Sequence, residues 1–226
     1  MIQTLWRGAS TTGMWNPTRY FRSSGIITKL ADGGDPAYVT RVGMLAAVSA
    51  HVAPKTSVEK EFMARSAFAS FSSSRERAMH YARGRDGRQL VVSGRLDHEV
   101  VLFKMDVSQR TPDKAPGTYL LKYDCDDSIR EPDFQEDIDL VRDTGGLAGG
   151  CEFCMNGKRP HALLLIDVAE YIRAQPSHSR DERALESAGA DEEWLALPMD
   201  HIERLRGDAA HIPRSVIWTY ETFKSA

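Results

Sequence analysis

The chain has few cysteines and no long apolar stretch. Its 226 residues include only three cysteines, Cys125, Cys151 and Cys154, and so small and odd a number does not indicate a disulfide scaffold. No apolar run reaches the roughly 18 residues that a membrane-spanning helix needs. The amino terminus lacks a basic segment followed by an apolar one, so a cleaved signal peptide is not expected. We therefore expect a cytoplasmic site of action and no membrane partner.

Neither sign of charge is in large excess. The formal net charge is −3 at pH 7, which gives no general preference for nucleic acid or anionic membranes. Hydrophobic residues make up 42% of the chain, enough to bury a core. Internal repeats are absent, and so are the Walker, nucleophile-elbow and dinucleotide-fold glycine motifs. We expect one domain over residues 1–226.

Local patterns predict an α+β fold with helices near the amino terminus and mostly strands later. Helical spacing of apolar residues predicts helices over 38–51, 57–66 and 74–83. Apolar or alternating stretches predict strands at 2–6, 68–72, 90–92, 100–105, 194–197 and 216–220, and a strand or helix start at 162–168. Ser74 is the expected N-cap of the third helix, and residues 175–183 are expected to form a polar surface loop.

Regular patterns stop between about residues 111 and 159. Prolines, an acidic run at 136–139 and two glycine pairs interrupt this stretch, which we interpret as an inserted irregular segment. Cys151 and Cys154 have the spacing of a zinc knuckle, and Cys125 with His161 would complete a Cys₃His set. Buried free thiols are the alternative that we favour, so we expect no metal site.

Three stretches far apart in the chain carry the candidate site residues. They are Leu5-Trp6-Arg7-Gly8, Phe68-Ala69-Ser70-Phe71-Ser72 and Asp191-Glu192-Glu193-Trp194-Leu195. Alternation along a strand would put Ser70 and Ser72 on one face and Phe71 in the core. Taken singly, each stretch has a plain explanation: a surface arginine, a serine-rich turn and a solvated acidic turn.

In this order, the three stretches resemble the Arg…Ser-x-Ser…acid-x-Glu signature of mono-ADP-ribosyltransferases of the Arg-Ser-Glu class. The resemblance implies an ADP-ribosyltransferase-like split β-sandwich with NAD in a cleft. It also implies that the chain transfers ADP-ribose from NAD to a macromolecule and releases nicotinamide. Members of this size are often toxins or effectors, which implies an antitoxin or inhibitor as a further partner.

The resemblance also implies roles for individual residues. Glu193 would be the catalytic carboxylate, Asp191 would face the acceptor, and Ser70 would orient Glu193. The residues expected to contact NAD are Arg7, Gly8, Ser70 and Ser72, with Arg85 and Arg88 of a glycine-rich loop at the pyrophosphate. This chemistry suits the residue types, because a fixed carboxylate stabilises the oxocarbenium-like ribose and an arginine fork binds phosphate.

The chain departs from the family pattern in three places. Phe71 stands where the family has threonine, Asp191 stands where it has glutamate or glutamine, and the separation between the serine and acid motifs is long. The acid at 191 favours a protein arginine as acceptor, with a nucleic-acid base second. A non-catalytic binding domain with a zinc-ordered insertion and an NAD glycohydrolase remain alternatives. We interpret Tyr81 as a core residue and His80 as incidental.

Overall fold

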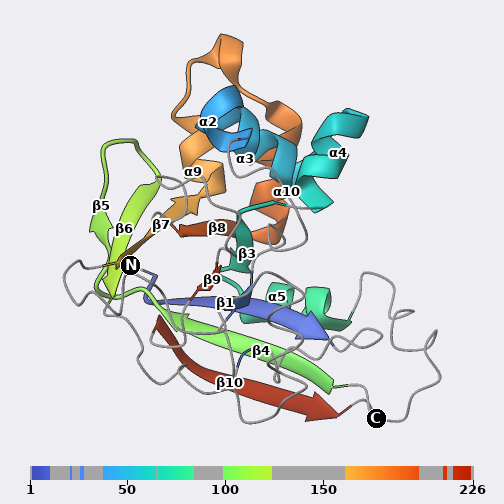
Figure 1. The fold of residues 1–226 in the computed structure, drawn as a ribbon, viewed down its shortest axis with the longest axis vertical. Helices are drawn as coiled ribbons and strands as arrows, with labels where there is room; N and C mark the ends of the chain where they lie inside the picture. The colour runs from blue at the N-terminus through green and yellow to red at the C-terminus, as the bar shows by residue number, and fades with distance from the viewer. Residues whose placement is uncertain are drawn as a thin grey trace.

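The computed structural model describes residues 2–10, 21, 26–27, 38–64, 66–83, 99–123, 161–198, 211–212 and 216–224. These residues form an α+β fold around an antiparallel sheet of eight strands (Figure 1). The α+β class expected from the sequence is confirmed. The predicted strand at 90–92 lies outside the described residues.

Strand pairing brings together segments that are distant in the sequence. The sheet order is β10-β4-β1-β3-β8-β7-β6-β5. Its strands are β1 (Thr4–Ser10), β3 (Ala69–Ser72), β4 (Glu99–Asp106), β5 (Thr111–Pro112), β6 (Thr118–Tyr123), β7 (His161–Asp167), β8 (Glu193–Pro198) and β10 (Ile217–Lys224). A separate short pair joins β2 (Ile26–Ile27) to β9 (His211–Ile212).

The sheet divides into two halves at the boundary between β1 and β3. On one side β1 pairs with β4 along its whole length, and on the other β3 pairs with β8 along its whole length. The pairing between β1 and β3 consists of a single residue pair, Trp6 with Ser72. We refer to β10, β4 and β1 as the first half of the sheet and to β3, β8, β7, β6 and β5 as the second half.

Side chains from both halves meet in one hydrophobic cluster. Leu5 and Phe103 of the first half belong to the same buried cluster as Phe71 and Trp194 of the second half. Strands β2 and β9 also contribute to it. One face of the sheet in both halves therefore packs into this cluster.

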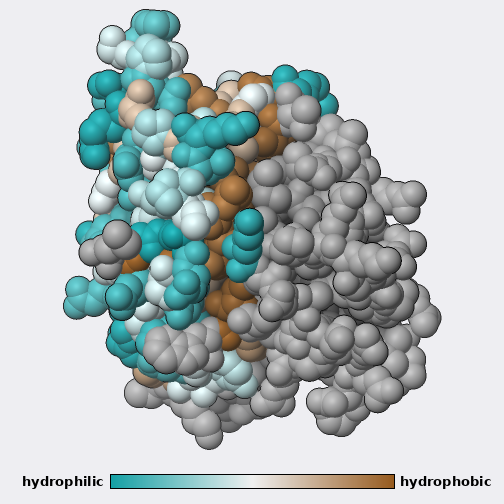
Figure 2. Space-filling view, turned by 90° about the vertical axis from the view of Figure 1, so that its left-hand side faces the viewer, coloured by the Kyte–Doolittle hydropathy of each residue, from teal (hydrophilic) through white to brown (hydrophobic). Residues whose placement is uncertain are grey.

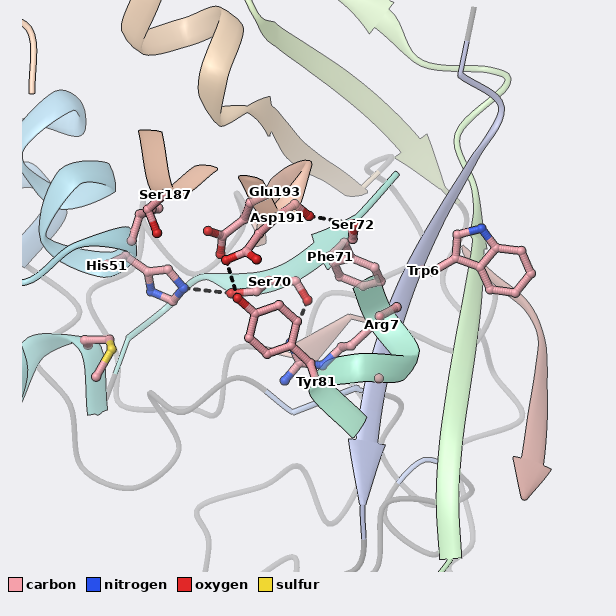
Figure 3. Close-up of a pocket in the computed structure, with 14 residues that line it drawn as sticks. Trp6, Arg7, His51, Ser70, Phe71, Ser72, Tyr81, Ser187, Asp191 and Glu193 are labelled. Atoms are coloured by element: carbon pink, nitrogen blue, oxygen red, sulfur yellow. Dashed lines mark hydrogen bonds between the residues drawn. The ribbon is translucent and has the colours of Figure 1, made fainter. Parts of the chain in front are cut away.

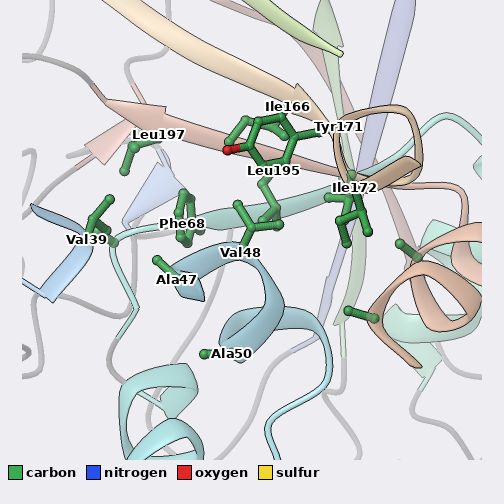
Figure 4. Packing of buried hydrophobic residues seen from close by; sticks show 14 of the residues in the cluster. Val39, Ala47, Val48, Ala50, Phe68, Ile166, Tyr171, Ile172, Leu195 and Leu197 are labelled. Atoms are coloured by element: carbon green, nitrogen blue, oxygen red, sulfur yellow. The ribbon is translucent and has the colours of Figure 1, made fainter. Parts of the chain in front are cut away.

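Helices cover the opposite face of the second half, where a second hydrophobic cluster forms (Figure 4). They are α2 (Tyr38–Val42), α3 (Met44–Val52), α4 (Ser57–Ala64), α9 (Val168–Arg173) and α10 (Glu182–Asp191). Val48 of α3 and Ile172 of α9 pack in this cluster with Ile166 of β7 and Leu195 of β8. Strands β3, β8 and β7 of the second half are therefore buried between two layers.

Helix α5 (Arg75–Arg83) ties the two halves together. It follows β3 directly, and the hydroxyl of Ser74 accepts a hydrogen bond from the backbone of Arg77 at 3.3 Å, as expected for an N-cap. It also packs on β1, and a Cβ added to Gly8 would lie 1.9 Å from the carbonyl oxygen of Ala78. Arg75 forms an ion pair with Glu221 of β10 at 2.6 Å. The helix thus reinforces a boundary that has few sheet hydrogen bonds.

Helices α2, α3, α4 and α5 lie in the amino-terminal part of the chain, as expected, but two further helices were not predicted. Helices α9 and α10 lie in the carboxyl-terminal part of the chain, and α10 begins inside the loop expected at 175–183. The buried residues of α10 are Ala184 and Ala188, small side chains in a segment that is otherwise mostly polar. The single helix expected over 38–51 is two helices, because Gly43 adopts a φ of 84° between them.

The described part of the irregular segment expected from residue 111 contains regular strands. Residues 111–112 and 118–123 form the hairpin of β5 and β6 at one edge of the sheet. Pro112 is tolerated because β5 is the edge strand, and Gly117 takes the positive φ of 73° that the connection requires. The rest of the expected insertion, residues 124–159, lies outside the described residues.

The surface on the β5–β6 side of the molecule is mostly hydrophilic among the described residues, with one hydrophobic strip (Figure 2). Within the part of the chain that the structure describes, no helix has the length and apolar character needed to cross a membrane.

Candidate active site

A pocket of about 260 Å³ opens at the boundary between the two halves of the sheet (Figure 3). It is lined by Trp6, Arg7, Gly8, His51, Val52, Met63, Ser70, Phe71, Ser72, Ala78, Tyr81, Ser187, Asp191 and Glu193. All three stretches that the sequence singled out contribute to it. The structure therefore brings together residues from both ends of the chain.

Arg7 crosses the boundary from the first half of the sheet to the second. Its Nη1 donates a hydrogen bond to the carbonyl oxygen of Ser70 at 2.7 Å. Desolvation by the surrounding protein lowers the pKa of Arg7 to about 10, which leaves the guanidinium charged at neutral pH. Among the described residues, no carboxylate forms an ion pair with it. A desolvated cation without a counter-charge is suited to bind an anion.

The two serines of β3 lie on the same face of the strand, as predicted. Phe71 is 3% exposed and packs in the cluster shared by the two halves, while Ser70 and Ser72 face the helices and the pocket. The Ser70 hydroxyl is hydrogen-bonded with Nε2 of His51 at 2.9 Å. Its expected role in orienting Glu193 stays a prediction. The Ser72 hydroxyl donates to the carbonyl oxygen of Asp191 at 2.8 Å, so it holds the acid motif in place.

The acid motif forms the turn that joins α10 to β8. Glu192 takes the left-handed conformation, with φ of 49° and ψ of 46°, and so reverses the chain direction within one residue. Ser73 holds this turn, since its backbone nitrogen donates to the Glu192 carbonyl at 3.1 Å and its hydroxyl to a Glu192 carboxylate oxygen at 2.9 Å. As a result, Asp191 and Glu193 line the pocket, while the Glu192 carboxylate is hydrogen-bonded to Ser73.

Tyr81 lies at the rim of the pocket, and its interpretation as a core residue is wrong. Its side chain is 40% exposed, and its hydroxyl donates a hydrogen bond to Oδ2 of Asp191. The sequence hid this role because Tyr81 fits the apolar stripe of α5 equally well. The contact restrains the Asp191 carboxylate from the side of the first half of the sheet.

Gly8 lines the pocket, but its close contact with α5 already explains why glycine occupies this position. Any side chain there would collide with the backbone of α5 at Ala78. The expected contact between Gly8 and NAD is not needed to account for the residue.

His51 is the site residue that the sequence analysis missed. It is 8% exposed, packs edge-on against the ring of Phe68 and lines the pocket from α3. Its two ring nitrogens lie within hydrogen-bonding distance of Ser66 and Ser70, which come from a different segment. No local motif marks such a histidine, because its partners are fixed only by the packing of α3 beside β3.

Several candidate residues are not placed. Arg85, Arg88, Cys125, Cys151 and Cys154 lie outside the described residues, and of His161 only the backbone, at the start of β7, is described. In the described ranges, no group of three or more His, Cys, Asp or Glu residues is arranged to hold a metal ion. The zinc set and the arginine loop therefore stay sequence-based hypotheses.

Comparison of the chain with family models, with curated proteins and with solved structures finds no match. Any assignment of function therefore depends on the pocket itself and on the resemblance of its motifs.

Proposed function

We propose that the chain is an NAD-dependent ADP-ribosyltransferase that transfers ADP-ribose to a macromolecular acceptor and releases nicotinamide. The observation that carries the proposal is the meeting of Arg7, Ser70, Asp191 and Glu193 in one pocket. These residues belong to three separate stretches whose order resembles the Arg-Ser-Glu signature. An accidental resemblance would not be expected to place all of them around a single cavity.

The residues of the pocket suit the charges of the reaction. The bond between the anomeric carbon and the nicotinamide nitrogen breaks, and its electron pair leaves with neutral nicotinamide. Glu193 would stabilise the positive charge that develops on the ribose, which is the largest electrostatic demand of the step. The acceptor nucleophile then forms the new bond to the anomeric carbon and loses a proton.

Arg7 would hold the pyrophosphate of NAD. Its guanidinium is charged and desolvated, and among the described residues no carboxylate neutralises it, so an anionic ligand would relieve an existing cost. The pocket is slightly smaller than the roughly 300–1,000 Å³ of typical ligand pockets, which suits the nicotinamide riboside end of an extended dinucleotide. Arg85 and Arg88 would add contacts to the phosphates, and NAD serves here as substrate.

The arrangement of the sheet supports an ADP-ribosyltransferase-like split β-sandwich. One hydrophobic cluster joins the two halves, a single residue pair connects them along the sheet, and the pocket lies at that connection. The proposal places the NAD cleft at this boundary.

A protein arginine is the acceptor that the pocket favours. Asp191 and Glu193 put two carboxylates on one wall, and Val52 and Met63 add apolar surface. A guanidinium with an aliphatic stem matches that combination in charge and in hydrophobicity. A nucleic-acid base is the second candidate acceptor. The resemblance further suggests a toxin- or effector-like enzyme that acts in a cytoplasm and is controlled by an antitoxin or inhibitor.

The test is nicotinamide release from NAD by the wild-type chain and by two neighbouring acid variants. Glu193→Gln should lose at least about a hundredfold to a thousandfold in kcat, because it removes the charge that stabilises the transition state. Glu192→Gln is the matched control, since this carboxylate is hydrogen-bonded to Ser73 and does not line the pocket. Its kcat should stay within about twofold of the wild-type value. Equal activity of all three proteins would refute the assignment.

Labelled NAD separates the possible outcomes for the acceptor. Label that stays on protein and is lost with protease indicates a protein acceptor, and label removed by nuclease indicates nucleic acid. Nicotinamide release without any labelled acceptor would indicate an NAD glycohydrolase. No release, together with one zinc per chain, would indicate a non-catalytic binding domain.

A further inference from the structure

A chain of hydrogen bonds runs from the buried core of the second half of the sheet to the pocket. Ser66 is fully buried, and its Oγ lies 2.8 Å from Nδ1 of His51. Nε2 of the same ring lies 2.9 Å from the Oγ of Ser70. Figure 3 shows His51 pointing at Ser70 beside the acid motif. Since Ser66 is outside the pocket and Ser70 lines it, the histidine connects a hidden hydroxyl to an accessible one.

The hydrogen-bond requirements of Ser66 decide the direction of this chain. Its Oγ accepts a hydrogen bond from the backbone nitrogen of Phe68 at 3.1 Å. Among the described residues, the contact left for its own hydroxyl hydrogen is Nδ1 of His51. If Nδ1 carried a proton instead, the Ser66 hydrogen would be buried without an acceptor, which typically costs about 1–3 kcal/mol. Ser66 therefore donates to Nδ1.

The direction then passes through the ring to Ser70. A neutral histidine that accepts at Nδ1 carries its proton on Nε2, so Nε2 donates to the Ser70 hydroxyl oxygen. Within the described residues the Ser70 hydroxyl has no second hydrogen-bond partner. Its hydrogen is consequently directed away from His51 and is available to the pocket.

We infer that His51 is a positioning residue: the relay Ser66→His51→Ser70 makes the Ser70 hydroxyl a hydrogen-bond donor into the pocket. In the absence of the relay this hydroxyl could rotate and could donate to His51 instead. The inference rests on the proposed function. In that function, a hydrogen-bond donor at Ser70 can hold the carboxylate of Glu193 or a ribose hydroxyl of NAD. His51 itself does not need to touch either reactant.

The tautomer of His51 is measured directly by NMR of ring-¹⁵N-labelled histidine in the wild-type protein without NAD. We expect a protonated Nε2 and an unprotonated Nδ1 near neutral pH, with the signals assigned by their loss in His51→Gln. A proton on Nδ1, or a doubly protonated ring, would overturn the relay. This measurement does not depend on NAD cleavage, so it decides the relay even if the proposed function fails.

Kinetics of nicotinamide release test the positioning role. His51→Leu removes the donor and should lower kcat by roughly tenfold to a hundredfold, with the KM for NAD changing little. His51→Gln keeps an amide N–H near the position of Nε2 and should restore most of the activity. Ser66→Ala removes the hydrogen bond that fixes the tautomer of His51 and should cause a smaller loss. Ser49 lies on the same helix as His51 but outside the pocket lining, so Ser49→Ala should behave as the wild type.

The outcomes separate positioning from a merely structural role. A folded His51→Gln variant that is as inactive as His51→Leu would contradict the inference, because the donor alone would then be insufficient. Full activity of a folded His51→Leu variant would contradict it as well. If His51→Leu does not fold, the NMR measurement and the Ser66→Ala variant still decide the question.

Discussion

The two halves of the sheet differ in how they are buried. In β7 of the second half, Leu163 and Leu165 pack toward the first half, and Leu164 and Ile166 pack toward the helices, so both faces are covered. In β10 of the first half, Ile217 is buried in the shared cluster, but Thr219, which pairs with Lys104 on the other face, is exposed. The central strands of the second half are thus interior elements, whereas the first half has a solvent-facing side that α5 covers only in part.

This difference explains where the pocket forms. Catalytic and binding groups need rigid support, and the strands of the doubly covered half supply it for Ser70 and Glu193, the residues proposed for these roles. Arg7 comes from the other half and reaches across the boundary. The two halves of the sheet are joined by a single residue pair between β1 and β3. A pocket can therefore open at this boundary without a cavity inside either hydrophobic cluster.

The largest expected effect on stability comes from adjacent positions of the doubly covered half. Leu164→Ala and Leu165→Ala remove side chains that face opposite clusters, and each should lower the free energy of unfolding by about 2–5 kcal/mol. Thr219→Ala, on the solvent-facing side of the first half, should cost about 1 kcal/mol or less. Urea denaturation measures all three, and a small cost at either leucine would remove the contrast between the halves.

The next effect tests whether α5 holds the halves together. Gly8→Ala puts a Cβ 1.9 Å from the Ala78 carbonyl oxygen and should cost about 1–3 kcal/mol as the helix shifts. Hydrogen exchange should show weaker protection of α5 and β1 than in the wild type, with the second half unchanged. Gly189→Ala is the control, because a Cβ there meets no atom within 4 Å. An unperturbed Gly8→Ala protein would mean that α5 does not clamp the boundary.

A smaller effect of opposite sign is expected at Arg7. Arg7→Met removes a desolvated charge and should raise the free energy of unfolding by about 1 kcal/mol near neutral pH, after loss of the hydrogen bond to Ser70 is counted. Burial lowers the pKa of Arg7 to about 10 from 12.5, so the folded chain loses this proton before the unfolded chain does. The free energy of unfolding of the wild type should therefore rise relative to that of Arg7→Met as the pH rises above about 10.

Denaturation at neutral pH and at a pH above about 10 measures this difference. The same variant should lose the increase in melting temperature that NAD or ADP-ribose gives the wild type, since ligand binding stabilises the folded state. An Arg7→Met protein that is less stable and still responds to NAD would contradict the role of Arg7 as an anion site.

The smallest expected effect comes from the ion pair between α5 and the first half. Arg75 and Glu221 are 48% and 41% exposed, so Arg75→Ala should change the free energy of unfolding by about 0.5 kcal/mol or less. Added salt should remove most of that change. A cost that is larger and insensitive to salt would point instead to the contacts of Arg75 with the rings of Trp6 and Phe223.

The predictions from sequence succeeded where the signal was local. Alternation indicated β3, a serine cap indicated α5, and a run of apolar residues indicated β8. They failed where packing decides: the buried face of α10 consists of small alanines in a mostly polar segment, and the collision that requires Gly8 involves a helix far along the chain. The acid, serine and arginine motifs were found from their order, whereas His51 depends on neighbours that no spacing reveals.

A crystal structure of the Glu193→Gln variant with NAD tests the central proposal most directly, because this variant should bind NAD without cleaving it. We expect intact NAD with its pyrophosphate at Arg7 and the nicotinamide ribose between Ser70 and the substituted side chain at position 193. NAD bound away from the boundary between the two halves of the sheet, or no bound NAD at saturating concentration, would contradict the proposal.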